Sequence, residues 1–258
     1  LQGRADLAYL PHGGAVAEVG VSPDGRWTYT AALDEGFYLG GGDGARIARL
    51  ARLDGGRLHW ADFSSDSKYI AAETDAGVTV WRLGDAPEVV LNLSARDLYD
   101  TPQDRFPNIG GAAFSPDGAQ IAIIETTGRL SVIEIEHGAR RSALLDGAGE
   151  DQRWFALAWT VSGIVAVHDF NILDVIDPAN FSLMGRNELS EIAGSQFGAS
   201  IVAARDARRI LVMNDLAAVL VDPDGPRTLA SFETDDYKAI RFSPDGAFLL
   251  VPDRPLGG

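Results

Sequence analysis

Few side chains in this sequence have a type and spacing suited to chemistry. The 258 residues contain no cysteine, which removes thiolate nucleophiles, thiolate metal sites and disulfides. The four histidines are His12, His59, His137 and His168. A carboxylate beside an imidazole can orient a general base, but His168 and Asp169 fall between two predicted strands, and we expect them in a surface turn. His59, at a predicted strand, is expected to be packed or half-buried.

Known catalytic and ligand-binding motifs are missing as well. The sequence has no G-x-S-x-G, H-E-x-x-H, Walker A or EF-hand pattern. The glycine-rich run Gly40–Gly44 follows one predicted strand and precedes another, so no helix N-terminus is available to hold a phosphate. Trp60, Trp154 and Trp159 are expected to be core side chains rather than a ligand cage. The sequence therefore predicts no catalytic residues, no metal ligands and no cofactor.

The charge balance limits the partners. Thirty-seven acidic residues against 22 basic ones give a net charge of −15, which repels polyanions and argues against nucleic acid as a partner. No apolar run approaches the roughly 18 to 20 residues of a membrane-spanning helix, so membrane insertion is not expected. Only Lys68 and Lys238 are lysines, an arginine bias that points to a bacterial source. The compartment, cytoplasm or periplasm, stays open.

An internal repeat organises the chain. The pentapeptide Val21–Gly25 (VSPDG) recurs as FSSDS, FSPDG and FSPDG at residues 63–67, 114–118 and 242–246. Weaker copies start at Trp159 and Ala203. The fourth position of the pentapeptide falls at residues 24, 66, 117, 162, 206 and 245. Six repeats of roughly 43 residues are therefore expected.

Each repeat predicts four short antiparallel strands. Proline, aspartate and glycine in sequence favour a tight turn, and apolar runs such as Ile121–Ile124 flank it, so the turn joins the first two strands. A second turn, Thr74–Gly77 in the second repeat, joins strands two and three. Fourth strands are clearest at residues 46–53 and 227–232. Four strands per repeat with no amphipathic helix is typical of a propeller blade.

On these turns the sequence resembles the WD-repeat and TolB-like β-propeller families. The segment Phe63–Leu83 is the most similar to a WD repeat, with Trp81-Arg82 where that family usually has a Trp-Asp pair. The resemblance implies an all-β propeller. It also implies an interaction role, because WD-repeat domains are chiefly scaffolds and TolB-like ones are periplasmic interaction proteins.

The repeats predict a single propeller domain over residues 1–258 with six four-stranded blades. The last repeat is short, and the segment Ala5–Leu10 is expected to supply a strand that completes this C-terminal blade and covers its edge. An incomplete seven-bladed propeller is the alternative. We expect the chain to belong to a larger bacterial protein or complex.

Charges differ between the two ends of the predicted blades. The Pro-Asp-Gly end carries the turns between strands one and two and between strands three and four, and its charges are nearly balanced. The acidic end carries the remaining turns and connections, and we assign to it Glu73, Asp75, Glu125 and Asp169 among many acids. Its longest insertion, Ser94–Ile109, contains the predicted partner-binding residues Asp97, Tyr99, Asp100, Asp104 and Phe106.

The sequence thus favours a non-catalytic interaction or sensor propeller whose acidic end binds a protein partner with a basic segment. The alternatives are a propeller enzyme of the lactonase, lyase or dehydrogenase kind, with a site at the channel mouth, and the regulatory propeller of a peptidase. For an enzyme the candidate residues are Glu18, His59 and His168.

Overall fold

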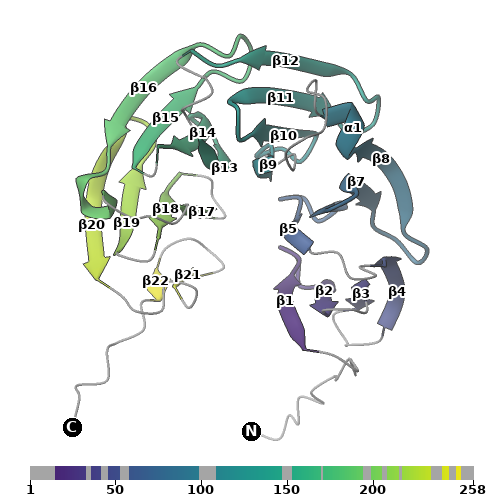
Figure 1. The fold of residues 1–258 in the computed structure, drawn as a ribbon. Coiled ribbons are helices and arrows are strands. Elements are labelled where there is room, and N and C mark those ends of the chain that lie inside the picture. Colours follow the sequence, from purple (N-terminus) through teal and green to yellow (C-terminus); the bar gives the residue numbers. More distant parts are fainter. Residues whose placement is uncertain are drawn as a thin grey trace, which may run out of the picture. The chain divides into compact units, whose positions relative to one another are not determined.

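The chain forms short β-strands with little helix (Figure 1). The structure is a computed structural model, and it describes residues 15–32, 36–41, 46–52, 58–98, 109–146, 153–169, 171–193, 199–204, 208–214, 217–233, 240–243 and 248–250. The chain divides into two compact units, Leu1–Thr101 and Pro102–Gly258.

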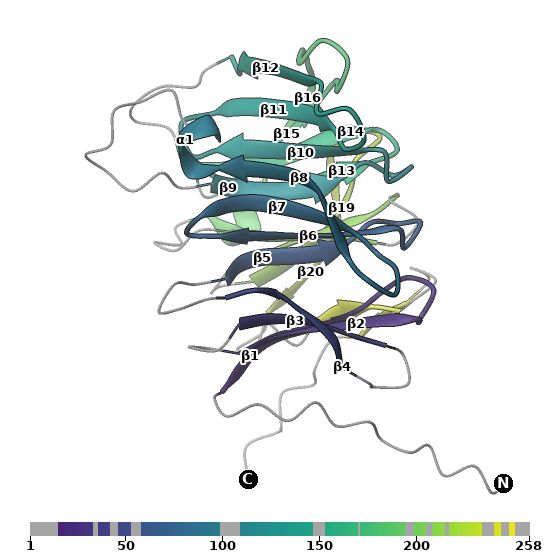
Figure 2. The ribbon, with the colours of Figure 1, turned by 90° about the vertical axis from the view of Figure 1, so that its right-hand side faces the viewer.

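The first unit contains two four-stranded antiparallel sheets. Sheet 1 consists of β1 (Val16–Val21), β2 (Trp27–Ala32), β3 (Gly36–Gly41) and β4 (Arg46–Ala51). Sheet 2 consists of β5 (Leu58–Phe63), β6 (Tyr69–Thr74), β7 (Gly77–Arg82) and β8 (Glu88–Ser94). The four-residue helix α1 (Ala95–Leu98) follows β8 directly and lies at its end (Figure 2).

The second unit contains three further four-stranded sheets and one hairpin. Sheet 3 consists of β9 (Ile109–Phe114), β10 (Gln120–Glu125), β11 (Arg129–Glu134) and β12 (Arg140–Leu144). Sheet 4 consists of β13 (Trp154–Thr160), β14 (Gly163–His168), β15 (Ile172–Ile176) and β16 (Leu183–Glu188), followed by the 3₁₀ turn η1 (Ser190–Ile192). Sheet 5 consists of β17 (Ser200–Ala203), β18 (Ile210–Met213), β19 (Ala217–Asp222) and β20 (Arg227–Glu233). The hairpin pairs β21 (Arg241–Phe242) with β22 (Leu249–Leu250).

The strands of every four-stranded sheet are paired in chain order, as the sequence predicts. Each repeat-turn pentapeptide whose flanking strands are described joins two paired strands, including the two weak copies in sheets 4 and 5. The segment Ala5–Leu10, expected to complete the last blade, lies outside the described residues. No helix in the described part of the chain is long and apolar enough to cross a membrane.

The second strands of sheets 2 to 5 are buried on both of their faces. All six residues of β14 and all four of β18 are buried, and five of the six residues of β10 are. Neighbouring residues of a strand point to opposite sides of the sheet. Such strands therefore need another layer of structure on each side, which explains why the sequence shows continuous apolar runs here instead of alternation.

Hydrophobic clusters fill the spaces between consecutive sheets. Ile164 and Ala166 of β14 pack in a cluster with residues of sheet 3, whereas Val165 and Val167 pack in a cluster with residues of sheet 5. A third cluster joins sheet 5 to the last hairpin. In the first unit, one cluster joins sheets 1 and 2 around Phe37. Within each unit, consecutive sheets thus share a continuous core.

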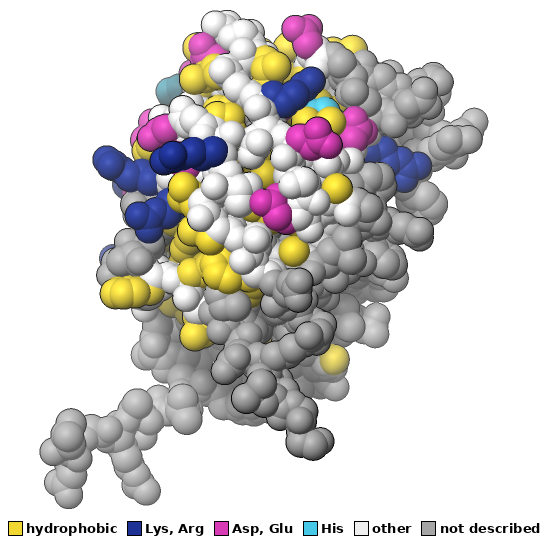
Figure 3. All heavy atoms as spheres, turned by 90° about the vertical axis from the view of Figure 1, so that its left-hand side faces the viewer, with side chains coloured by type: hydrophobic (Ala, Val, Ile, Leu, Met, Phe, Trp, Pro, Cys, Tyr) yellow, Lys and Arg dark blue, Asp and Glu magenta, His cyan; other side chains and the backbone are white. Residues whose placement is uncertain are grey.

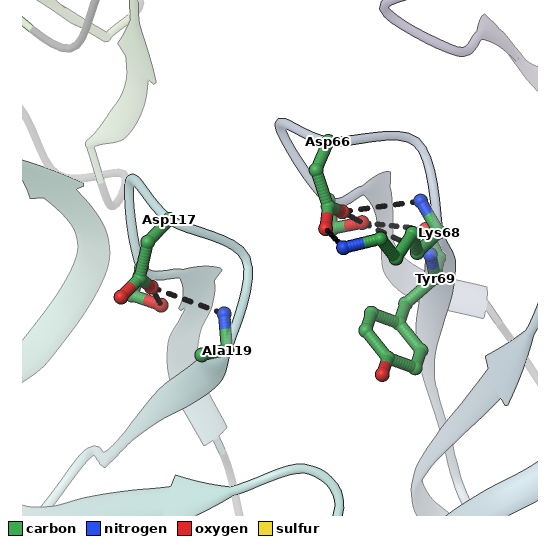
Figure 4. A network of polar contacts seen from close by, with 7 residues as sticks. Asp66, Lys68, Tyr69, Asp117 and Ala119 are labelled. Atoms are coloured by element: carbon green, nitrogen blue, oxygen red, sulfur yellow. Dashed lines mark hydrogen bonds and ion pairs between the residues drawn. The ribbon is translucent and has the colours of Figure 1, made fainter.

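A serine and an aspartate fix the first turn of sheets 1, 2 and 3. The serine hydroxyl donates to the aspartate Oδ1 in the pairs Ser22–Asp24, Ser64–Asp66 and Ser115–Asp117, at 2.6 to 2.8 Å. The same Oδ1 accepts a backbone N–H two residues later, as Figure 4 shows for Asp66 and Asp117. The turns in sheets 1 and 3 then place glycine at a φ of 73°, which costs a glycine little.

The turn of sheet 2 carries serine at the position of that glycine. Ser67 adopts a φ of 58°, a strained conformation for a residue with a side chain. Its hydroxyl accepts a hydrogen bond from the backbone N–H of Asp24 at 3.1 Å. The side chain therefore links the first turns of sheets 1 and 2, which offsets part of the backbone strain.

Sheets 3 and 4 approach each other closely at their first strands, β9 and β13. A Cβ atom added to Gly111 of β9 would lie only 2.8 Å from the backbone nitrogen of Leu157 in β13. Backbone atoms cannot move aside as a flexible side chain can. Glycine is therefore required here by space rather than by its dihedral freedom.

We predict that Gly111→Ala separates β9 from β13 and lowers the free energy of unfolding by about 1 to 3 kcal/mol, the usual cost of overpacking. The control is Gly84→Ala, since a Cβ at Gly84 meets no atom within 4 Å. Urea unfolding followed by tryptophan fluorescence measures both. Equal stability of the two variants would contradict this packing.

Candidate functional site

The insertion proposed to bind a partner starts from the capped helix α1. Ser94 donates to Asp97 Oδ2 from its backbone N–H at 3.0 Å and from its hydroxyl at 2.6 Å. In return, the backbone N–H of Asp97 donates to Ser94 Oγ at 3.3 Å. This reciprocal pattern is a capping box. Leu98, the last helical residue, is buried, so the start of the insertion is held firmly against sheet 2.

Asp97 is thus exposed but has a structural task, since its carboxylate holds the start of α1. The other four predicted partner-binding residues, Tyr99, Asp100, Asp104 and Phe106, lie outside the described residues. Their assignment stays a prediction.

Two acids assigned to the acidic end are buried instead of forming part of its surface. Glu73 and Glu125 each expose only 7% of their surface. Glu125 is neutralised within sheet 3, with Arg129 Nε 3.8 Å from its Oε1 and the Thr127 hydroxyl donating to its Oε2 at 3.4 Å. Their assignment to the acidic surface was wrong because the sequence places them beside turns without showing which way each side chain points.

Glu73 lies in an environment that disfavours its charged form. Burial raises its pKa to about 8, and the negative charge of Asp75 adds to this rise. At neutral pH the carboxyl group is therefore mostly protonated, in contrast to an ordinary glutamate.

His59 and Asp75 form a surface pair on sheet 2. His59 Nε2 lies 2.6 Å from Asp75 Oδ1, and the two side chains expose 43% and 58% of their surface. The histidine sits at the irregularity in the pairing of β5 with β6, which turns it outward. His59 is thus a partly exposed strand residue, close to the half-buried state that the sequence suggested.

His168 is buried, so its expected place in a surface turn was wrong. It is the last residue of β14 and exposes 1% of its surface. Its ring lies 4.3 Å from that of Trp154, centroid to centroid, and its Nδ1 lies 3.1 Å from Asp169 Oδ2. Its Nε2 lies 3.3 Å from Asp174 Oδ2, without the geometry of a hydrogen bond. The strand runs one residue further than the sequence indicated, which takes the imidazole into the core.

Arg186 neutralises the charge beside His168. It donates from Nε and Nη2 to both oxygens of Asp174, at 2.6 and 2.7 Å, across the pairing of β15 with β16. Burial raises the pKa of Asp174, but the hydrogen bonds and charge of Arg186, together with the nearby His168, outweigh that effect and hold the pKa below its usual value. Bidentate pairs between a guanidinium and a carboxylate are among the strong hydrogen bonds of proteins.

The polar groups at the ends of the second strands serve the fold. Glu125 is the last residue of β10 and His168 is the last residue of β14. In sheet 5, Asn214 directly follows the second strand, β18, and occupies the corresponding position. The Asn214 side chain donates to the carbonyl of Ile192 at 2.9 Å and accepts the N–H of Ala217 at 3.1 Å. These side chains therefore fix connections between strands at the acidic end of sheets 3, 4 and 5.

In the first unit, the enzyme candidates Glu18 and His59 have separate partners. Glu18 accepts a hydrogen bond from the Tyr29 hydroxyl at 2.8 Å, whereas His59 pairs with Asp75. Within the described ranges, no three histidine, aspartate or glutamate side chains are placed to hold a metal ion. Trp154 and Trp159 are buried core residues, as predicted.

The Pro-Asp-Gly end of sheets 3 and 4 has an open pocket of about 510 Å³. We call it the sheet 3–4 pocket. Its lining includes Pro116, Asp117, Val161, Asp177, Pro178 and Met184. The sequence analysis missed this pocket, although a signal was present: the repeat at Trp159–Gly163 lacks Pro-Asp-Gly.

Comparisons with known proteins agree with the architecture. No protein-family model matches the sequence, and no curated protein is significantly similar to it. Among solved structures, the chain is similar to the β-propeller domain of Cps50 (Swd1) from Myceliophteria thermophila, with a TM-score of 0.70 and 12% sequence identity. The match covers 93% of this chain and 80% of that one. The chain is thus an all-β propeller, of a fold that supports many functions.

We predict that Glu73→Gln stabilises the protein increasingly as the pH rises from 5 to 8. The raised pKa means that the native state binds this proton more tightly than the unfolded state, so the wild type loses stability between pH 4.5 and about 8. Glutamine has no charge to bury. At pH 8 the free energy of unfolding of the variant should exceed that of the wild type by on the order of a few kcal/mol.

Urea unfolding at several pH values gives this difference. Glu134→Gln, which removes an exposed glutamate of β11, is the control and should show little change. A gain for Glu73→Gln that does not vary with pH would contradict a buried, protonated Glu73.

We predict that Arg186→Ala lowers the free energy of unfolding by about 2 to 4 kcal/mol, because it leaves the buried Asp174 carboxylate without its main partner. Arg82→Ala is the matched control. Arg82 and Glu88 form an exposed pair at 3.0 Å between the third and fourth strands of sheet 2, where the expected cost is below about 1 kcal/mol. Denaturant unfolding of both variants measures the two losses. Equal losses in the free energy of unfolding would contradict the role of Arg186 as the main partner of a buried Asp174.

Proposed function

We propose that this chain is a non-catalytic interaction or sensor propeller, part of a larger bacterial protein or complex, that binds a protein partner with a basic segment at its acidic end. The observation that carries the proposal is the capping box of α1. This capping box fixes the first residues of the long insertion Ser94–Ile109 against sheet 2, and Asp100 and Asp104 follow in the sequence.

Electrostatics support the choice of partner. The net charge of −15 attracts basic segments at long range. Asp75 and Asp97 are exposed at the acidic end of sheet 2, and Asp146 is exposed at the same end of sheet 3. Such attraction raises association rates and weakens as salt screens it. The arginine bias of the sequence supports a bacterial source, and the similarity to a propeller domain supports a rigid platform for loops.

Asp97 needs separate treatment in any test. Removing its charge also weakens the two hydrogen bonds that Ser94 donates to it in the capping box, so a loss of binding on Asp97→Asn has two explanations. Asp100 and Asp104 carry the charge of the proposed surface without that known task.

We predict that the double variant Asp100→Asn/Asp104→Asn no longer captures a partner that the wild-type domain captures from a bacterial lysate. Raising the salt concentration above the physiological level should weaken capture by the wild type by about tenfold. Affinity capture with mass spectrometry at low and high salt identifies the partner. Titration of a synthetic peptide with its basic segment then measures the affinity for each variant.

The control is Asp85→Asn/Glu134→Gln, which removes two exposed acids near the other end of the strands and should retain the partner. The proposal is wrong if both double variants bind the basic peptide as the wild type does.

A further inference from the structure

The sheet 3–4 pocket exists because one turn of sheet 4 is short. In sheet 3, Ser115 pairs with Gln120 across a turn of four residues. In sheet 4, Thr160 pairs with Gly163 across a turn of two, Val161 and Ser162. The Thr160 hydroxyl closes this turn by donating to the carbonyl of Gly163 at 2.9 Å. The missing residues leave open the space beside the longer turn of sheet 3.

Two exposed apolar side chains border that space. Val161, at the tip of the short turn, exposes 58% of its surface, and Met184 of the edge strand β16 exposes 59%. Figure 3, which faces the side where β16 and β20 lie, shows apolar side chains gathered among acidic and basic ones. Neither side chain contributes to the core in this position, and both line the same pocket, so they offer apolar surface to a ligand there.

One wall of the pocket is held in a strained conformation. Phe181 adopts a φ of 62° in the turn between β15 and β16. Its N–H donates to the carbonyl of Asp177 at 2.8 Å, as the N–H of Gly138 donates to Glu134 in sheet 3. A bulky residue at a glycine position costs on the order of 1 to 3 kcal/mol. This strain needs support from surrounding contacts.

Arg141 of β12 supplies that support from the neighbouring sheet. Its Nη1 donates to the carbonyls of Pro178 and Ala179 at 3.0 and 2.8 Å, and its guanidinium lies 5.7 Å from the centre of the Phe181 ring. The Phe181 side chain also packs against the core cluster between sheets 3 and 4. On the other side, the hydroxyl of Ser162 donates to Asp224 of sheet 5. The pocket is therefore formed before any ligand binds, which lowers the entropic cost of binding.

The charge of the pocket selects its ligand. Asp117 and Asp177 line it, and none of its described lining residues is lysine or arginine. Asp177 Oδ1 accepts the N–H of Ala179 at 2.7 Å, while its Oδ2 accepts no hydrogen bond from the described residues. The guanidinium of Arg141 is already bound to the two carbonyls of the wall. The pocket thus presents a carboxylate oxygen beside apolar surface.

We propose that the sheet 3–4 pocket binds a peptide segment of a partner protein through an arginine or lysine flanked by apolar residues. The aliphatic stem of the basic side chain lies along Val161 and Met184, and its charge reaches Asp177. This site is separate from the proposed acidic-end surface, because it lies at the Pro-Asp-Gly end of the strands.

The test uses three acetylated and amidated tripeptides, Leu-Arg-Leu, Leu-Gln-Leu and Leu-Glu-Leu, added to the ¹⁵N-labelled chain. We expect Leu-Arg-Leu to shift the backbone amide signals of residues 115–120, 160–163 and 177–184, with an affinity about fivefold or more above that of Leu-Gln-Leu. Leu-Glu-Leu should bind more weakly still. High salt should reduce the preference for arginine.

Two variants separate the charge from the apolar contact. Asp177→Asn keeps an oxygen for the Ala179 N–H and should bring the affinity for Leu-Arg-Leu down to that for Leu-Gln-Leu. Met184→Ser should weaken both peptides equally, and it is a mild change because Met184 is exposed. Asp85→Asn, in the corresponding turn of sheet 2, is the matched control and should change nothing.

The proposal is overturned if the peptide leaves the pocket amides unshifted, if Leu-Glu-Leu binds as well as Leu-Arg-Leu, or if Asp177→Asn retains the preference for arginine. It is also overturned if Asp100→Asn/Asp104→Asn abolishes binding of the tripeptide, since the ligand would then sit at the acidic end. Shifts that depend on protein concentration alone would show that a second copy of the chain occupies the pocket.

Discussion

The burial of the second strand on both faces is the constraint from which the fold follows. A β-strand has two faces, and in β14 and β18 both are apolar and covered. Sheets of this kind are unstable alone, because each must pack a neighbour on either side. The clusters on the two sides of β14, one shared with sheet 3 and one with sheet 5, meet this need within the second unit. Edge strands such as β12 and β16 are mostly exposed, which leaves the strand ends and the edges for function.

The repeat pattern predicted the fold because its turns are local. Serine, aspartate and glycine at fixed spacing close a turn through contacts within six residues, so the sequence shows the turn without knowledge of the rest of the chain. Even the weak copy at Trp159–Gly163 was placed correctly. Sequence reasoning failed where the outcome depended on side-chain direction at a strand end. His168 and Glu73 lie one or two residues from a turn, and a small change in the strand end decides whether they are buried or exposed.

The difference between local patterns and contacts that depend on the whole fold also explains how much of the candidate sites the sequence predicted. Acidic residues in a long insertion are visible in the sequence, and they gave the acidic-end hypothesis; the capping role of Asp97 depends on one helical turn that only the structure shows. The sheet 3–4 pocket needs two turns of different length side by side and an arginine reaching from β12 to the turn after β15. Residues distant in the sequence create it, so the missing Pro-Asp-Gly of the fourth repeat indicates only the short turn and not the pocket.

Hydrogen–deuterium exchange, resolved to single amides, tests the central claim most directly. If burial on both faces holds the sheets together, then the amides of β6, β10, β14 and β18 exchange slowest, and those of the edge strands β12, β16 and β20 exchange much faster. The protected amides should also open together within each unit. Second strands that exchange as fast as the edge strands would contradict the account.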